Sequence, residues 1–175
     1  MYKSARPSLC RALLAAAWML GMTATASAAE HRLEIARSYV EALHAGQWDR
    51  VRALTGPAFR FSDPTAEGHE TVITRADDLE TFLDYMQANR PDGDAEALVE
   101  DGFASGRHVT LLVRYRGRLD GEALGTEGGP RGFDVPGVTI LTVVDGKVVH
   151  HLDYVDYETL QRQLSEPATG SDPVP

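Results

Sequence analysis

The stretch VTILTVVDGKVVHHLDYVDY, residues 138–157, decides most of the fold. Apolar and β-branched residues flank Asp145 and Gly146, and an Asp-Gly pair readily adopts the positive φ angles that a two-residue hairpin turn requires. We therefore expect two strands, 133–144 and 147–155, to pair in an antiparallel sheet.

The end of the second strand carries several polar side chains. Because successive side chains of a strand point to opposite faces, His151 and Asp153 share one face, and His150 and Tyr154 lie on the other. Two neighbouring histidines on a strand cannot converge on one metal ion, so we expect no metal site here. A histidine two residues from an aspartate on one face can share a proton with it, which makes His151 and Asp153 candidate acid/base groups. The alternative for His151 is a hydrogen-bonded histidine in a pocket wall.

Upstream of this stretch, helical periodicity gives way to the alternation typical of strands. We expect helices at 30–44, 47–54 and 75–89, strands at 59–64, 95–106 and 107–119, and a last short helix at 157–164. Helices followed by hairpin-connected strands indicate an α+β fold, in which a curved antiparallel sheet wraps around the N-terminal helices. A sheet curved around helices encloses a pocket.

Residues 1–28 have the layout of a secretory signal peptide: basic residues, then the apolar run 12–22, then small residues up to Ala28. We expect cleavage after Ala28 and a periplasmic or secreted protein, the alternative being an uncleaved N-terminal anchor. The mature chain then comprises one domain, 29–165, and a proline-rich tail, 166–175, that is too polar to fold and is expected to be disordered.

The chain has 175 residues and a formal net charge of −9, which suits one acidic globular domain. Such a surface repels nucleic acid and anionic lipid, so neither is expected as a partner after signal cleavage. The one cysteine, Cys10, lies in the predicted signal peptide, which excludes disulfides, thiolate metal sites and cysteine nucleophiles from the mature domain. The sequence shows no glycine-rich phosphate loop and no G-x-S-x-G motif, and we expect no cofactor.

Four segments resemble the nuclear transport factor 2-like superfamily, which includes SnoaL-like polyketide cyclases, ketosteroid isomerases and limonene epoxide hydrolases. They are YVEALHAGQWDRVRAL, FRFSDP, TRADDLETFL and VTILTVVDGKVVHHLDYVDYETLQRQL. The resemblance covers about residues 32–165. It implies a cone-shaped α+β barrel, a cystatin-like roll, with a pocket for a small apolar molecule at the wide end. It also implies a homodimer.

Asp63 is a further candidate for acid/base chemistry. On its strand it shares a face with Phe59 and Phe61, so a carboxylate would lie among aromatic rings, a setting suited to proton transfer. The resemblance places Asp63 on the general base of ketosteroid isomerase. The alternative is an aspartate that forms a turn before Pro64.

The resemblance also places Tyr39 on the isomerase tyrosine that donates a hydrogen bond to the developing oxyanion. The alternative is an ordinary core tyrosine. The isomerase's second donor is an aspartic acid, and Thr139 stands in its place here, so steroid isomerisation is in doubt.

For Asp153, the resemblance implies the acid/base carboxylate of epoxide hydrolases and SnoaL-like cyclases, whereas Asp156 fits the N-cap of the last helix. The hydrolases also use an Arg-x-Asp pair. Arg114 and Arg116 stand at those positions, so we do not expect epoxide hydrolysis and place both arginines on the outer face of the sheet.

We expect the pocket wall to contain Phe59, Phe61, Trp48, Leu111, Val113, Tyr115, Thr139 and Leu141. His44 and His69 are expected at the surface. Two functions remain open on the sequence. One is an exported isomerase or cyclase in which Asp63, Asp153, Tyr39 and His151 act on a small apolar ligand. The other is a non-catalytic module of the same fold that binds a ligand or forms a dimer.

Overall fold

The structure, a computed structural model, describes residues 9–69, 72–90, 95–119 and 131–165, with side chains in the first helix described from residue 27 onward. The predicted tail and the start of the predicted signal peptide lie outside these ranges. No helix in the described part of the chain is both long and apolar enough to cross a membrane.

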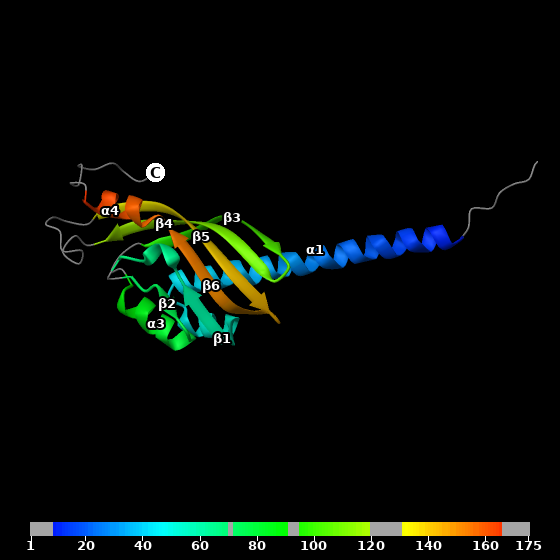
Figure 1. Cartoon of the computed structure of the whole chain (residues 1–175), viewed down its shortest axis with the longest axis horizontal. Helices are drawn as coiled ribbons and strands as arrows, with labels where there is room; N and C mark the ends of the chain where they lie inside the picture. The colour runs from blue at the N-terminus through cyan, green and yellow to red at the C-terminus, as the bar shows by residue number, and fades with distance from the viewer. Residues whose placement is uncertain (1–8, 70–71, 91–94, 120–130, 166–175) are drawn as a thin grey trace, which may run out of the picture.

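The chain forms one six-stranded sheet that curves around helices on its inner face (Figure 1). The helices are α1 (Leu9–His44), α2 (Trp48–Leu54), α3 (Leu79–Ala88) and α4 (Tyr157–Ser165), with a short 3-10 helix, η1 (Pro64–Ala66). The strands are β1 (Thr55–Ser62), β2 (Arg75–Ala76), β3 (Glu96–Ser105), β4 (His108–Leu119), β5 (Arg131–Val144) and β6 (Lys147–Val155). Their order across the sheet is β2-β1-β6-β5-β4-β3. The predicted α+β fold is confirmed.

The predicted hairpin joins β5 to β6. Asp145 and Gly146 both have positive φ angles, 49° and 74°, as a two-residue turn of this kind requires. The register then places Thr139 opposite Asp153 and Leu141 opposite His151. The hairpin therefore fixes which β5 side chains stand beside the polar residues of β6.

The sheet is mixed, whereas the sequence predicted an antiparallel one. β1 pairs in parallel with β6, with Phe61 opposite His151. The chain between these strands contains most of the remaining elements, and a long connection of this kind allows parallel pairing, which a short hairpin does not. The predicted third helix also begins later than expected, because Arg75–Ala76 form β2 and the Asp78 side chain caps α3 by accepting from the Thr81 amide.

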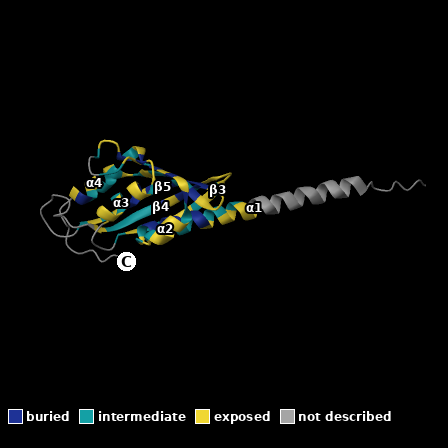
Figure 2. Ribbon diagram, turned by 90° about the horizontal axis from the view of Figure 1, so that it is seen from below, coloured by how far each residue is buried: buried dark blue, intermediate teal, exposed yellow. Residues whose placement is uncertain are grey.

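The core lies where α1 meets the inner face of the sheet (Figure 2). Tyr39 and Val40 of α1 are buried there, together with Leu111 of β4 and Leu141 of β5. α1 is buried on one face because its apolar residues recur at helical spacing. This packing leaves the open end of the curved sheet to form a cavity.

The outer face of β4 carries the predicted arginines. Arg114 Nε lies 2.6 Å from Glu100 Oε1, and its Nη1 lies 2.9 Å from Asp134 Oδ1. Arg116 Nε lies 2.5 Å from Glu96 Oε1. Both arginines lie on the outer face of the sheet, as the sequence predicted, and they form cross-strand ion pairs there.

Candidate active site

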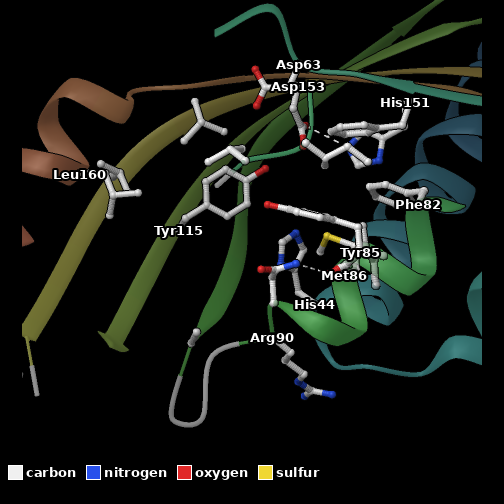
Figure 3. A pocket seen from close by; sticks show the side chains of 18 of the residues that line it. His44, Asp63, Phe82, Tyr85, Met86, Arg90, Tyr115, His151, Asp153 and Leu160 are labelled. Carbon is white, nitrogen blue, oxygen red and sulfur yellow. Dashed lines mark hydrogen bonds and ion pairs between the residues drawn. The ribbon is translucent and has the colours of Figure 1, made fainter. Parts of the chain in front are cut away.

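A cavity of about 290 Å³ lies between the helices and the inner face of the sheet (Figure 3). Its wall is mainly apolar and aromatic, with residues from α1, α3, β4, β5, β6 and α4. The polar side chains among the lining residues include His44, Asp63, Tyr85, Tyr115, His151, Asp153 and Tyr157. A mostly apolar hollow with a few convergent polar groups is the usual form of a small-molecule site.

His151 and Asp153 form the central polar pair of this cavity. Both project from the inner face of β6, and His151 Nε2 lies 3.0 Å from Asp153 Oδ1. The His151 side chain is 2% exposed and that of Asp153 is 13% exposed. The two atoms are in close contact, but the geometry is not that of a well-aligned hydrogen bond. The sequence prediction that these two residues share one face and meet is therefore confirmed in the structure.

Tyr39 holds the other side of the imidazole ring. Its hydroxyl lies 3.1 Å from His151 Nδ1, and the two rings meet edge to face at 5.5 Å. In the neutral tautomer that carries its proton on Nε2, Nδ1 is the acceptor and the Tyr39 hydroxyl is the donor. Burial first, and the nearby Asp153 carboxylate second, raise the pKa of Tyr39 well above its usual value. Tyr39 therefore keeps its proton and fixes the orientation of His151.

Asp153 is held by a chain of hydroxyl groups from the neighbouring strands. Thr139 Oγ1 donates to Asp153 Oδ1 at 2.5 Å, and the Tyr115 hydroxyl lies 3.2 Å from Thr139 Oγ1. Burial by itself would raise the pKa of Asp153. The neighbouring His151 and the hydrogen bond from Thr139 lower the pKa by more than burial raises it, so the pKa lies below its usual value. In the described part of the chain, the polar contacts of this carboxylate, to Thr139 and His151, are both made by Oδ1. Oδ2 is therefore available to a ligand.

Asp63 also lines the cavity, but its carboxylate is fully engaged. Oδ1 accepts from the Thr65 amide at 2.9 Å, the Thr65 hydroxyl at 2.5 Å and the Ala66 amide at 3.2 Å. Oδ2 accepts from the Tyr157 hydroxyl at 2.8 Å. Asp63 is 2% exposed, so it is an N-cap of η1 that also ties α4 to the end of β1.

The predicted wall residues divide into two groups. Trp48, Phe61 and Tyr115 line the cavity. The others lie in the buried core and are not among the lining residues; they are Phe59, Leu111, Val113, Thr139 and Leu141. Tyr39 likewise lies behind His151 rather than at the wall. Alternation along a strand predicts the inward face correctly, but not how far along that face the cavity extends.

Sequence reasoning missed His44, which was expected at the surface and instead lines the cavity. Burial lowers its pKa from 6.5 to about 4, and the nearby Asp153 only partly opposes that effect. The available signal was spacing: His44 follows buried Val40 by one helical turn and therefore lies on the same face of α1. His69, also expected at the surface, is half-buried, and its ring packs against that of Tyr157 with centroids 4.9 Å apart and planes tilted by 36°.

The two neighbouring histidines of β6 point to opposite faces, as predicted. His150 Nε2 lies 3.2 Å from Ser62 Oγ on the outer face, whereas His151 faces the cavity. In the described part of the chain, no three His, Cys, Asp or Glu side chains are grouped so that they could hold a metal ion.

The chain is similar to proteins of one known family. A model of the family described as SnoaL-like polyketide cyclase matches residues 33–164. The aklanonic acid methyl ester cyclase DauD of Streptomyces sp. (strain C5) is 27% identical over 143 residues, which cover 78% of this chain and 83% of that protein.

Two solved structures show the same fold. IdmH of Streptomyces antibioticus, a candidate polyketide cyclase, has a TM-score of 0.66 and 24% identity, covering 77% of this chain and 99% of that one. An LEH-like epoxide hydrolase of M. tuberculosis has a TM-score of 0.60 and 15% identity, covering 78% of this chain and 90% of that one. The predicted nuclear transport factor 2-like fold is confirmed.

Proposed function

This chain belongs to the SnoaL-like polyketide cyclase family, and we propose that it catalyses cofactor-independent proton transfer on a small, largely apolar carbonyl compound, leading to ring closure or isomerisation. The observation that carries this proposal is the buried pair of His151 and Asp153 in the wall of an apolar cavity. The similarity to a cyclase that acts on aklanonic acid methyl ester supports the same class of reaction.

In the first step, the Asp153 carboxylate accepts a proton from a carbon next to a carbonyl group. The electron pair of the broken C–H bond forms the C=C bond of an enolate, and the carbonyl oxygen takes up the negative charge. Because its pKa lies below the usual value, Asp153 is ionised at neutral pH but is a weak base. The proposal therefore favours substrates whose acidic carbon lies between two carbonyl groups, since such carbons lose a proton more readily.

In the second step, the enolate carbon attacks another carbonyl carbon of the same molecule. A C–C bond forms, the C=O π pair becomes an alkoxide, and the alkoxide takes the proton back from Asp153. Substrate and product are isomers, so no oxidant, reductant or cofactor is consumed. In an isomerisation, the same proton returns to a different carbon.

His151 and Tyr39 act as positioning residues in this scheme. His151 Nε2 faces Asp153 Oδ1, while the Tyr39 hydroxyl holds Nδ1 and so fixes the ring. Asp63 is assigned a positioning role as well, because four donors already occupy its two oxygens. This differs from the role that the isomerase resemblance implies for Asp63 and Tyr39.

The test is exchange of the α-proton of ethyl 2-methyl-3-oxo-3-phenylpropanoate in deuterated buffer, followed by proton NMR. We expect the wild type to exceed the buffer rate, and Asp153→Asn to lose about a hundredfold or more of the enzymatic rate. Asp49→Asn, whose carboxylate is fully exposed on α2, is the matched control and should behave as wild type.

Exchange no faster than in buffer, with binding of the ester shown by calorimetry, would contradict catalysis and favour the non-catalytic binding module. That module would use the same cavity, so binding without turnover separates the two functions. Equal exchange rates for Asp153→Asn and the wild type would instead show that Asp153 is not the base.

We also propose that the protein is exported, because of its signal-like N-terminus. Expression of the full chain with a C-terminal tag, followed by fractionation and N-terminal sequencing, tests this proposal. A chain that begins at Ala29 in the periplasm or medium is expected. An intact N-terminus in the cytoplasm would contradict it.

A further inference from the structure

We propose that His44 donates the hydrogen bond to the substrate's carbonyl oxygen, the role that the isomerase resemblance would give to Tyr39. The inference rests on the function proposed above. It also narrows the substrate class to molecules that carry a carbonyl oxygen on the side of the cavity formed by the end of α1.

The position of His44 is the first argument. It is the last residue of α1, and its ring packs against that of Tyr115, with centroids 5.3 Å apart and planes tilted by 50°. In Figure 3 the imidazole points into the cavity, toward Tyr85 and Tyr115. His44 and Asp153 line the same cavity and interact electrostatically. A ligand between them can meet both groups at once.

The second argument is that three tyrosine hydroxyl groups in or behind the cavity wall are already hydrogen-bonded. The Tyr115 hydroxyl bonds Thr139, and the Tyr157 hydroxyl donates to Asp63. The Tyr39 hydroxyl bonds His151 behind the wall. By contrast, neither ring nitrogen of His44 is hydrogen-bonded to a residue in the described part of the chain. A polar group at a cavity wall without a protein partner is the one that a ligand can satisfy.

Arg90 is another candidate donor, and its geometry argues against this role. In Figure 3 its guanidinium points away from the rest of the cavity. It packs over the turn between α1 and α2, where a Cβ added to Gly46 would meet Arg90 Nη1 at 1.7 Å. Arg90 therefore occupies the space above Gly46, whereas His44 faces the cavity.

The protonation state of His44 suits the role. Burial lowers its pKa to about 4, so the ring is neutral at pH 7 and carries one N–H. A neutral imidazole can stabilise a developing oxyanion by a hydrogen bond without giving up its proton. His44 then stays neutral throughout, and Asp153 alone accepts and returns the transferred proton.

The test is a thermodynamic cycle with two ligands of nearly the same shape, 2-acetylnaphthalene and 2-ethylnaphthalene, of which only the first has a carbonyl oxygen. Dissociation constants are measured for the full chain at pH 7.5 by fluorescence titration. The variants are His44→Leu, which cannot donate, and His44→Gln, which can. His31→Leu is the control, because His31 is largely exposed on α1. The ratio of the two constants cancels general effects of each substitution on the apolar cavity.

We expect His44→Leu to weaken ketone binding relative to hydrocarbon binding by about three- to tenfold, the effect of one hydrogen bond. His44→Gln should restore most of that preference, and His31→Leu should match the wild type. An unchanged ratio in His44→Leu would overturn the inference. The proton-exchange assay tests the proposed catalysis separately. If exchange fails but His44→Leu still weakens ketone binding, the proposed catalysis is contradicted and the contact between His44 and the carbonyl oxygen is not. Binding of neither ligand would overturn the inference about His44 and leave the proposed catalysis to the exchange assay.

Discussion

Phe61 of β1 stands directly opposite His151 of β6 in a parallel pairing, with ring centroids 5.1 Å apart and planes at 85°. The phenylalanine closes one side of the imidazole, and Phe82 of α3 closes another at 5.6 Å. The histidine is therefore enclosed by aromatic rings, and its polar contacts are to Tyr39 and Asp153. The parallel crossover, rather than the hairpin alone, creates the dry environment of the acid/base pair.

The role of Tyr39 can be tested by Tyr39→Phe. The substitution keeps the ring and removes only the hydroxyl that bonds His151. If Tyr39 positions His151, the free energy of unfolding should fall by about 1 kcal/mol. The exchange rate should then fall only severalfold. A direct oxyanion donor would lose about 10²- to 10³-fold. Urea denaturation and the exchange assay distinguish these outcomes.

Asp63 and Tyr157 should behave as a structural pair. Asp63→Asn and Tyr157→Phe each break the 2.8 Å hydrogen bond that ties α4 to the end of β1. We expect each to lower the free energy of unfolding by about 1–3 kcal/mol, because a buried partner is left unsatisfied. The double variant should cost less than the sum of the two, as expected for groups in contact. A loss of exchange activity by Asp63→Asn as large as that of Asp153→Asn would restore Asp63 as a base.

Gly137 makes room for the Tyr115 ring. A Cβ at this position would lie 2.6 Å from Tyr115 Cε2, whereas at Gly132 of the same strand the nearest atom would be 3.9 Å away. Gly137→Ala should displace the ring from the cavity wall and cost about 1–3 kcal/mol of stability. Gly132→Ala should change stability by no more than about 0.5–1 kcal/mol. Equal thermal shifts for both variants would show that Tyr115 does not depend on Gly137.

The sequence could predict the hairpin and the His151–Asp153 pair, because a turn signal and a two-residue period act over short distances. It could not predict that β1 runs parallel to β6. The alternating pattern of FRFSDP shows which side chains point inward, but not which strand lies alongside. That neighbour is set by the packing of the whole sheet.

The site was predicted less completely for a related reason. The direction of a hydroxyl or an imidazole depends on tertiary contacts that no local pattern encodes. Tyr39 was correctly predicted to be inward-facing, yet its hydroxyl reaches His151 instead of the cavity. His44 was overlooked because its polarity at a helix end resembles an ordinary surface residue.

The predicted homodimer remains a prediction, and the outer face of the sheet suggests where it would form. Leu112 and Tyr154 lie in line across β4, β5 and β6 and are 44% and 40% exposed, with Phe103 nearby at 62%. Exposed apolar side chains gathered on one face are typical of an interface. Light scattering after size exclusion should show a dimer that Leu112→Asp dissociates. A monomeric wild type at high concentration would contradict the prediction.

The stability of the protein should fall as the pH is lowered from about 6.5 to about 4, because His44 has a folded pKa of about 4 against an ordinary value of 6.5. In that window the unfolded chain binds a proton at His44 and the folded chain does not, so stability rises with pH. The effect is at most about 3 kcal/mol. His150, whose pKa is also lowered by burial, contributes in the same direction. Asp153 affects the stability only at lower pH, because its pKa in the folded protein lies below the usual value of 3.8.

Urea denaturation at pH 7.5, 5.5 and 4.5 measures how the free energy of unfolding depends on pH. His44→Gln should reduce this slope markedly, and His150→Gln should reduce it less. His31→Gln, which removes an exposed histidine, should leave it unchanged. A slope in His44→Gln equal to that of the wild type would mean that His44 is not neutral in the folded protein, and would also weaken its proposed role as a neutral hydrogen-bond donor.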